Sequence, residues 1–216
     1  MITDERIAKY IESLEADLPP LLREIEMDAI RDEVPIIKKP ARSLLRYIIL
    51  QNRPKQILEV GAAVGFSSLY MSEFIDPNSH ITTIEKVPKR IEEAKQNFLR
   101  AGKEEKIQLL EGDATEILSD LRRSGNVYDM IFMDAAKGQY LHFMPDVMAL
   151  LAKGGTLISD NVLQDGDIVE SRFAVTRRNR TIHLRMREYL YALTHDETLD
   201  TMILPIGDGV AISRRR

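Results

Sequence analysis

The sequence predicts an α/β fold: a Rossmann-like, doubly wound sheet of seven strands that ends in an antiparallel hairpin. From residue 56 onward, short apolar segments of strand length alternate with segments of helical spacing, the order that produces parallel strands joined by crossover helices. The run Met130-Ile131-Phe132-Met133 is apolar without alternation, which is typical of a strand buried on both faces. Two further strand patterns flank a glycine-containing turn at residues 205–209, and they predict the hairpin.

Each element follows from its own local pattern. Strands are expected at residues 57–60, 80–85, 107–110, 128–134, 156–160, 198–204 and 210–213. The helices of this part are expected at residues 67–75, 88–101, 114–123, 139–152 and, with an irregular start, about 167–193. Three more helical patterns, at residues 3–16, 21–30 and 41–50, are separated by prolines. They predict a helical N-terminal extension (residues 1–52) within a single domain that spans 1–216.

The composition favours a cytoplasmic enzyme or binding protein. The chain is 44% hydrophobic and 30% charged, with a formal net charge of −4, so its overall charge argues neither for nor against a nucleic-acid partner. It has no cysteine, which excludes a disulfide framework, a thiolate metal site and a cysteine nucleophile. No apolar run approaches the roughly 20 residues of a transmembrane helix, and the first residues lack the pattern of a signal peptide.

The stretch from Gln56 to Ser68 predicts a cofactor site. An apolar strand passes through Gly61 and Gly65 into a helix start, which brings backbone N–H groups to one point. The dinucleotide fingerprint requires a glycine two residues after Gly61, and this chain has Ala63 there. The pattern Glu59-x-Gly61-x-x-x-Gly65 therefore favours S-adenosylmethionine.

Two acidic residues at later strand ends support the same cofactor. Glu85 follows Gly65 by 20 residues at the end of the second strand, where a carboxylate can accept both ribose hydroxyls. Asp113 ends the third strand, where it can accept the adenine amino group. Glu85 alone would be interpreted as a solvated loop carboxylate. The glycine turn, Glu85 and Asp113 lie at the ends of three successive strands, however, and a chance coincidence of all three is improbable.

Polar side chains at the ends of the fourth and fifth strands predict a metal site. Asp134 ends one of these strands, and Asp160 and Asn161 end the other. In a doubly wound sheet the two strands are neighbours, so we expect the three side chains to converge. Two carboxylates and an amide oxygen are hard ligands suited to Mg²⁺. The alternative for any single one of them is a helix cap.

Three motifs carry a resemblance to a known family. They are Glu59-x-Gly61-x-x-x-Gly65-Phe66-Ser67, Tyr128-Asp129-Met130-Ile131-Phe132-Met133-Asp134-Ala135-Ala136-Lys137-x-x-Tyr140 and Gly155-x-Leu157-Ile158-x-Asp160-Asn161-Val162. Through them, and through nearly its whole length, the chain resembles the cation-dependent O-methyltransferases, which include the catechol and caffeoyl-CoA O-methyltransferases.

The resemblance implies a role for each matched residue. It implies that Asp134, Asp160 and Asn161 bind a divalent cation and that Lys137 matches a lysine that assists deprotonation of the substrate hydroxyl. The cofactor-binding residues that it implies are Ile37, Glu59, Gly61, Ser67, Glu85, Asp113, Ala114 and Asp134. Among these, Ser67 and the backbone near Ile37 would bind the methionyl carboxylate, and Asp134 would contact both the cation and the methionyl ammonium.

The chemistry needed is limited, because a sulfonium methyl is already activated. The enzyme has to supply an oxyanion and an in-line approach, and a bound cation lowers the pKa of a coordinated hydroxyl. Lys137 can accept the proton if the nearby metal lowers its own pKa. The alternative is an ordinary exposed lysine that pairs with an acid. A substrate with two vicinal oxygens would chelate such a cation well.

A concentration of basic residues bears on the substrate. Residues 171–187 contain six arginines and no acidic residue, Arg42 and Arg46 lie near the expected cofactor mouth, and the chain ends in three arginines. Arginine suits phosphate recognition, although a charge run is usually a solvated face. The candidate RNA-binding residues are Lys38, Lys39, Arg172, Arg177, Arg178 and Arg180.

Within the family, the chain resembles a bacterial branch of tRNA 5-hydroxyuridine methyltransferases. This implies methylation of 5-hydroxyuridine to 5-methoxyuridine at the wobble position, with the tRNA anticodon stem-loop as substrate. O5 and O4 of that base are vicinal oxygens, and an unpaired base can be splayed into a pocket. The alternatives are a small-molecule catechol-type O-methyltransferase and, disfavoured because the site residues are present, a catalytically silent RNA-binding relative. The resemblance and the apolar N-terminal helices also predict a homodimer.

Overall fold

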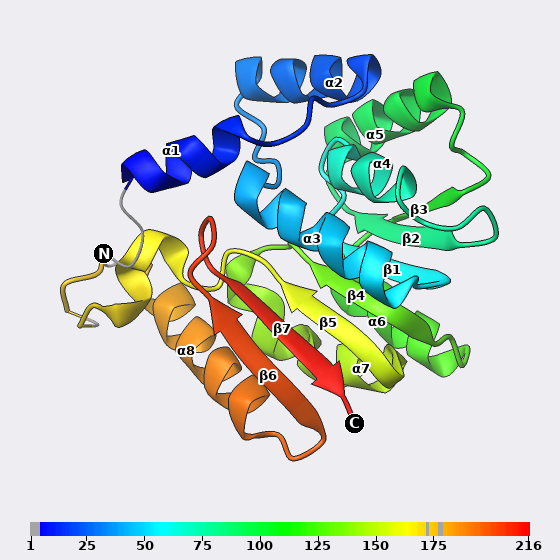
Figure 1. The fold of residues 1–216 in the computed structure, drawn as a ribbon. Helices are drawn as coiled ribbons and strands as arrows, with labels where there is room; N and C mark the ends of the chain where they lie inside the picture. The colour runs from blue at the N-terminus through cyan, green and yellow to red at the C-terminus, as the bar shows by residue number, and fades with distance from the viewer. Residues whose placement is uncertain (1–4, 172, 177–178) are drawn as a thin grey trace.

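The computed structural model describes residues 5–171, 173–176 and 179–216, which form a seven-stranded sheet in the order β3-β2-β1-β4-β5-β7-β6 (Figure 1). The strands are β1 (Gln56–Val60), β2 (His80–Glu85), β3 (Ile107–Glu111), β4 (Tyr128–Met133), β5 (Leu151–Ser159), β6 (Leu199–Leu204) and β7 (Val210–Arg215). Strands β1 to β5 pair in parallel, whereas β7 runs antiparallel to both β5 and β6. The predicted fold class is confirmed.

Helices cover both faces of this sheet (Figure 1). They are α1 (Glu5–Ser13), α2 (Pro20–Arg31), α3 (Lys39–Asn52), α4 (Phe66–Ser72), α5 (Pro88–Ala101), α6 (Ala114–Arg123), α7 (Tyr140–Leu150) and α8 (Arg180–His195), with short 3₁₀ helices η1 (Lys137–Gln139) and η2 (Gln164–Val169). None of the helices in the described ranges combines the length and the apolar character needed to cross a membrane.

Two hydrophobic cores form, one on each face of the sheet. Ile57 of β1 packs in the core beneath α2 to α5, while its neighbour Leu58 packs in the core beneath α6 to α8. Successive strand residues point to opposite faces, so a strand buried on both sides has apolar residues at consecutive positions. This explains why β4 shows no polar alternation from Met130 to Met133.

Two predicted boundaries differ from the structure. The predicted helix at 167–193 is divided: the helix proper begins at Arg180, and η2 precedes it. The Ser171 hydroxyl accepts the backbone N–H of Phe173 at 3.1 Å, a local bond that competes with helix formation. Strand β5 begins at Leu151 rather than at residue 156, because an irregularity in its pairing with β4 accommodates the Gly154-Gly155 segment.

Candidate active site

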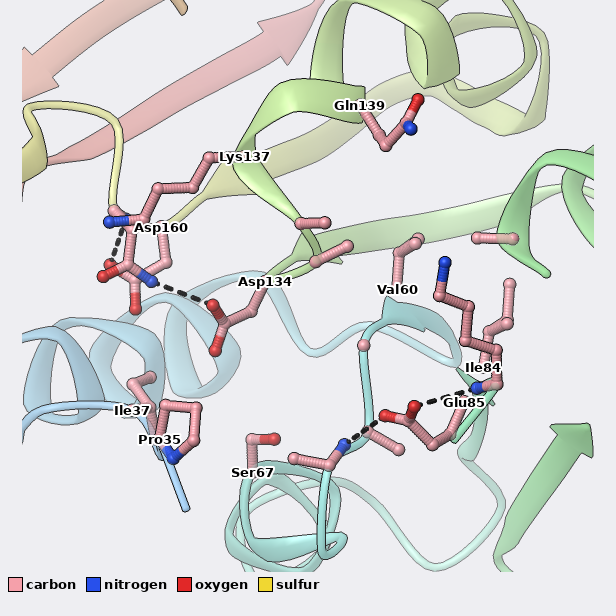
Figure 2. A pocket seen from close by; sticks show the side chains of 18 of the residues that line it. Pro35, Ile37, Val60, Ser67, Ile84, Glu85, Asp134, Lys137, Gln139 and Asp160 are labelled. Atoms are coloured by element: carbon pink, nitrogen blue, oxygen red, sulfur yellow. Dashed lines mark hydrogen bonds between the residues drawn. The ribbon is translucent and has the colours of Figure 1, made fainter. Parts of the chain in front are cut away.

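A cavity of about 640 Å³ opens at the carboxyl ends of the parallel strands, where a doubly wound sheet places its ligands. Figure 2 shows acidic side chains at two ends of it: Asp134 and Asp160 lie at one end, and Glu85 lies at the other. The predicted site residues that line this cavity are Ile37, Lys38, Gly61, Ser67, Glu85, Asp113, Ala114, Asp134, Lys137, Asp160 and Asn161. Most of the predicted residues are therefore brought to one place.

The predicted metal-binding trio converges at the ends of β4 and β5. Asn161 donates from Nδ2 to Oδ1 of Asp134 at 2.9 Å, and its backbone N–H donates to Oδ1 of Asp160 at 2.7 Å (Figure 2). None of the three caps a helix: the residues that precede η1 and η2 are Ala136 and Leu163. The capping alternative is thus excluded for this trio.

The two carboxylates of the trio have strongly perturbed acidity. Burial, followed by the charge of Glu59, raises the pKa of Asp134 to about 6. Burial, followed by the charge of Asp134, raises the pKa of Asp160 to about 7. Buried carboxylates that repel one another are destabilised in their ionised form, and a cation between them would relieve this repulsion.

The side chains of the trio fit a divalent cation. Across the described residues, no group of three or more His, Cys, Asp or Glu side chains is arranged to hold a metal ion. The trio contains only two carboxylates, and its third member is an amide. Because Nδ2 of Asn161 bonds to Asp134, Oδ1 of the same amide is the atom that can act as a ligand. Carboxylate and amide oxygens are the donors that Mg²⁺ and Ca²⁺ prefer.

Lys137 lies beside these acids. It begins η1, lines the cavity and is partly buried. Its positive charge acts on both Asp134 and Asp160, opposing the rise in their pKa values. It forms no ion pair of 4.0 Å or less with any residue in the described ranges, so the alternative of a lysine paired to a nearby acid does not describe it.

Tyr140 fixes the two strand ends relative to each other, a role that the sequence did not reveal. Its fully buried hydroxyl lies 3.0 Å from the carbonyl oxygen of Met133 and 3.1 Å from that of Asp160, and it donates to them. Burial raises the pKa of Tyr140 well above its usual value, so the hydroxyl keeps its proton. A tyrosine three residues after Lys137 was part of the matched motif, but only the fold shows what it bonds to.

Gly61 is required where β1 meets β4. Its φ is +107°, and a Cβ added there would lie 2.3 Å from the carbonyl oxygen of Asp134. L-residues rarely adopt this conformation, and the backbone of Asp134 leaves no room for a side chain. Gly61 thereby lets the glycine loop after β1 approach the trio of Asp134, Asp160 and Asn161.

Glu85 and Asp113 are held by backbone N–H groups. Glu85 accepts from Ala63 at 2.8 Å and from Lys86 and Val87 at 2.8 and 2.9 Å (Figure 2). Asp113 caps α6 by accepting the N–H of Thr115 at 2.9 Å, and this bond lowers its pKa. Both residues line the cavity, and Asp113 also pairs with Lys86 at 3.3 Å.

Glu59 is the predicted cofactor residue that the structure does not bring into the cavity lining. Its side chain is fully buried beneath the glycine loop, where Oε2 accepts from the hydroxyls of Ser68 and Thr83. Oε1 has no hydrogen-bond partner, and burial raises the pKa of the carboxyl. Glu59 therefore joins β1, α4 and β2 rather than lining the cavity.

The predicted RNA-binding residues differ in their surroundings. Arg172, Arg177 and Arg178 lie outside the described residues. Lys39 is exposed at the start of α3, and Arg180 begins α8, where its guanidinium lies 5.9 Å from the centre of the Phe173 ring. Lys38 lines the cavity but is ion-paired with Asp208.

Two other predicted parts of the basic surface are engaged elsewhere. Arg42 is buried between Glu15 and Glu26, with its guanidinium 5.5 Å from the Tyr70 ring. Its placement at a basic mouth was wrong, because these two acids hold it in the interior. At the C-terminus, Arg215 donates to main-chain carbonyls and Arg216 pairs with Asp200.

Comparison with known proteins identifies the family. A profile of the O-methyltransferase family matches residues 12–216. The chain belongs to this family. The predicted resemblance to the O-methyltransferases is confirmed.

Individual relatives of this O-methyltransferase agree with the assignment. A catechol O-methyltransferase of Niastella koreensis is 34% identical over 117 residues, a match covering 54% of this chain and 53% of that protein, so the aligned part spans about half of the relative's length. A solved Staphylococcus aureus structure, provisionally named a caffeoyl-CoA O-methyltransferase, is 32% identical with a TM-score of 0.90, covering 99% of this chain and 100% of that one. A Bacillus cereus O-methyltransferase solved with SAH has a TM-score of 0.85 at 18% identity, covering 98% and 97% of the two chains, and shows the shared fold.

Proposed function

We propose that this O-methyltransferase depends on a divalent cation such as Mg²⁺ and converts 5-hydroxyuridine at the tRNA wobble position to 5-methoxyuridine. The observation that carries the cation dependence is the convergence of Asp134, Asp160 and Asn161 at one end of the cavity. A cation held there by two carboxylates stabilises a substrate oxyanion and fixes its position.

In this proposal, residues at both acidic ends of the cavity would hold the cofactor. S-adenosylmethionine supplies an activated methyl group on its sulfonium sulfur. Glu85 accepts the ribose hydroxyls, and Asp134 accepts the methionyl ammonium. The remaining cofactor contacts are assigned to Ile37, Gly61, Ser67, Asp113 and Ala114, all of which line the cavity. Glu59 supports this set indirectly by holding α4 through Ser68.

Lys137 is the residue that we assign to proton transfer. It lines the cavity, and its positive charge acts on both Asp134 and Asp160. An ammonium beside a substrate oxygen favours the oxyanion, and in its neutral form the same amine accepts the hydroxyl proton. Lys137→Met is expected to lower turnover while leaving cofactor affinity unchanged.

Two exposed features support an RNA substrate. Phe173 is 82% exposed, and Arg180 lies over its ring. Exposed aromatic rings and arginines together bind single-stranded nucleic acid by stacking and by phosphate contact. Arg185, also in α8, donates to the carbonyl oxygen of Gly138, the residue that follows Lys137, at 3.0 Å.

The second candidate function is methylation of a small catechol. It is favoured by the names of the relatives, since the Niastella koreensis protein is a catechol O-methyltransferase. Both candidates present two vicinal oxygens to the same trio, so the geometry of the cation site serves either. Because Arg42, Arg215 and Arg216 are engaged elsewhere, the argument for an RNA substrate depends mainly on the residues around Phe173.

A homodimer forms part of the proposal. Helix α1 exposes Ile7, Tyr10 and Ile11, each more than half accessible. Their spacing places them on one face of the helix, and an apolar face of this kind favours association. Light scattering of the wild type and of Tyr10→Glu/Ile11→Glu tests it: a monomeric wild type would refute the dimer.

The decisive experiment compares substrates directly. The protein is incubated with labelled S-adenosylmethionine, Mg²⁺ and either tRNA bearing 5-hydroxyuridine or a panel of catechols, and the products are identified by mass spectrometry. We expect 5-methoxyuridine in the tRNA. Methylation of catechols alone would replace the RNA proposal with the second candidate.

Salt dependence provides an independent check of RNA recognition. Phosphate contacts release counterions, so log(kcat/KM) for tRNA should fall linearly with log salt, by about 0.7 per phosphate contact on a single strand. Arg177→Glu/Arg178→Glu and Arg180→Glu should impair tRNA methylation but spare the free nucleoside. The matched control is Arg123→Glu. Arg123 is the last residue of α6, and Asp113, which lines the cavity, caps the opposite end of that helix. Kinetics that do not respond to salt would oppose the RNA substrate.

A further inference from the structure

Asp208 is an acidic residue in the cavity to which neither the cofactor nor the cation assigns a role. It lies in the turn between β6 and β7, and its side chain is only 10% exposed. It lines the same cavity as Asp134, Asp160 and Asn161. Its charge acts on both aspartates of the trio, raising their pKa values, which places its carboxylate within electrostatic reach of the cation site.

The turn holds Asp208 at a fixed position relative to that trio. The carbonyl of Asp208 accepts the N–H of Leu163 at 2.8 Å, and the carbonyl of Gly209 accepts the N–H of Val162 at 2.9 Å. Gly209 has a φ of +89°, and a Cβ there would lie 2.2 Å from the Leu163 side chain. The segment that follows Asn161 is therefore packed directly against the turn, and Asp208 cannot shift without moving it.

Lys38 holds the carboxylate of Asp208 from the other side. Its ammonium forms an ion pair with Oδ1 of Asp208, while its own side chain remains 55% exposed. The turn also packs on this lysine, since a Cβ at Gly207 would lie 3.7 Å from Cβ of Lys38. One carboxylate oxygen is thus oriented by a counter-ion, and a carboxylate has further lone pairs with which to accept a hydrogen bond.

We infer that Asp208 is a specificity-determining residue that accepts a hydrogen bond from a substrate donor adjacent to the two oxygens that face the cation trio. The inference rests on the proposed function, in which the substrate is 5-hydroxyuridine. Along one edge of that base, O5 and O4 form the vicinal pair and N3–H follows as the next group. A carboxylate beside the cation site accepts from N3–H, and it repels a base whose N3 carries a lone pair, such as 5-hydroxycytosine.

This role requires the donor on the substrate, so a substrate in which that donor is methylated tests it. Two synthetic anticodon stem-loops are compared, one with 5-hydroxyuridine and one with N3-methyl-5-hydroxyuridine at the wobble position. Both retain O5 and O4. Because a hydrogen bond to a charged acceptor is at stake, we expect the wild type to prefer the N3–H substrate by about tenfold to hundredfold in kcat/KM.

Three variants separate the hydrogen bond from simple packing. Asp208→Ala should slow the N3–H substrate until the two substrates differ little, and Asp208→Asn, which keeps a neutral acceptor, should recover part of the preference. Lys38→Met removes the ion pair but keeps the acid, so it should retain the preference. Melting temperatures and calorimetric affinity for S-adenosylmethionine establish that each variant is folded and binds cofactor.

Several outcomes would overturn the inference. Equal methylation of both substrates by the wild type would do so, as would an undiminished preference in Asp208→Ala. If the preference is smaller in Asp208→Ala only because this variant methylates the N3-methyl substrate faster than the wild type does, Asp208 acts by steric exclusion instead. If the wild type methylates neither stem-loop but does methylate catechols, the proposed function fails and the inference fails with it. Failure of the preference alone leaves the proposed function standing.

Discussion

Asn161 donates from Nδ2 to Oδ1 of Asp134 at 2.9 Å, joining the ends of β4 and β5 inside the cavity. This bond fixes the amide, so that its oxygen is free to act as a ligand. It also occupies only one oxygen of a carboxylate whose ionised form is disfavoured by burial and then by the charge of Glu59. The pair is arranged to receive a positive charge, and the first two predictions follow from that.

Removal of divalent cations should abolish methyl transfer. Because a cation that stabilises an oxyanion contributes several kcal/mol, exhaustive EDTA treatment should lower turnover by at least about 100-fold, and added Mg²⁺ should restore it. Asp160→Ala should have the same effect on turnover while calorimetry shows that S-adenosylmethionine still binds. Asp200→Asn, at an exposed ion pair with Arg216, is the matched control. Full activity after chelation would contradict the cation dependence.

The stability of the cation-free protein should depend on pH in a defined direction. The pKa values of Asp134 and Asp160 are about 6 and about 7 in the folded chain, above the value of about 3.9 for an unfolded aspartate. The folded state therefore binds more protons in this range, so the two groups contribute most below about pH 4 and lose that contribution as pH rises to about 7.

Other carboxylates with lowered pKa values, such as Asp113, act in the opposite direction. The measurement is therefore a difference: the free energy of unfolding of the wild type minus that of Asp160→Asn, obtained by denaturant titration between pH 4 and 8. We expect this difference to fall as pH rises, and we expect Mg²⁺ to stabilise the wild type most above pH 7, where both carboxylates are ionised. A flat difference would show that Asp160 titrates normally.

Gly61→Ala should disrupt the cofactor loop. The new Cβ would lie 2.3 Å from the carbonyl of Asp134, at a φ of +107°, so we expect a loss of about 1–3 kcal/mol in stability and weaker binding of S-adenosylmethionine. Gly102→Ala is the control, since Gly102 has a φ of +60° and nothing within 4 Å of its added Cβ. Thermal melting and calorimetry separate the two. Unchanged cofactor affinity in Gly61→Ala would disprove the role of this glycine.

Much of the fold was predictable because it depends on local patterns. The run from Met130 to Met133 identified a strand buried on both faces, and the structure places it in the centre of the sheet. The segment between η2 and α8 was predicted less well. The described residues of this segment form a side-chain bond at Ser171 and bury Val175, and neither feature leaves a periodic signal.

Residue patterns alone indicated site residues only where side chains follow strand ends, and the resemblance to the family added others, such as Ile37. Asp134 and Asp160 were found because parallel strands deliver their carboxyl ends to one edge of a sheet. Asp208 and Arg42 show the limit of this reasoning. Asp208 comes from an antiparallel turn, and Arg42 is buried by acids 27 and 16 residues away in sequence. Contacts between distant segments decide both positions, and spacing along the chain does not report them.

Tyr140→Phe should weaken cation binding, and it changes no residue that lines the cavity. The hydroxyl of Tyr140 donates to the carbonyls of Met133 and Asp160. Met133 keeps another donor, the N–H of Asp160, so the loss falls mainly on the carbonyl of Asp160. We expect a stability loss of about 1–2 kcal/mol and a several-fold weaker affinity for Mg²⁺, measured by the cation dependence of turnover.

Tyr189→Phe is the matched control, because Tyr189 is equally buried and packs edge-on against Tyr140, but its hydroxyl bonds to Ser159 at 2.6 Å. It should lose similar stability and keep its cation affinity. Equal cation affinity in the wild type and Tyr140→Phe would show that the position of Asp160 does not depend on this hydroxyl.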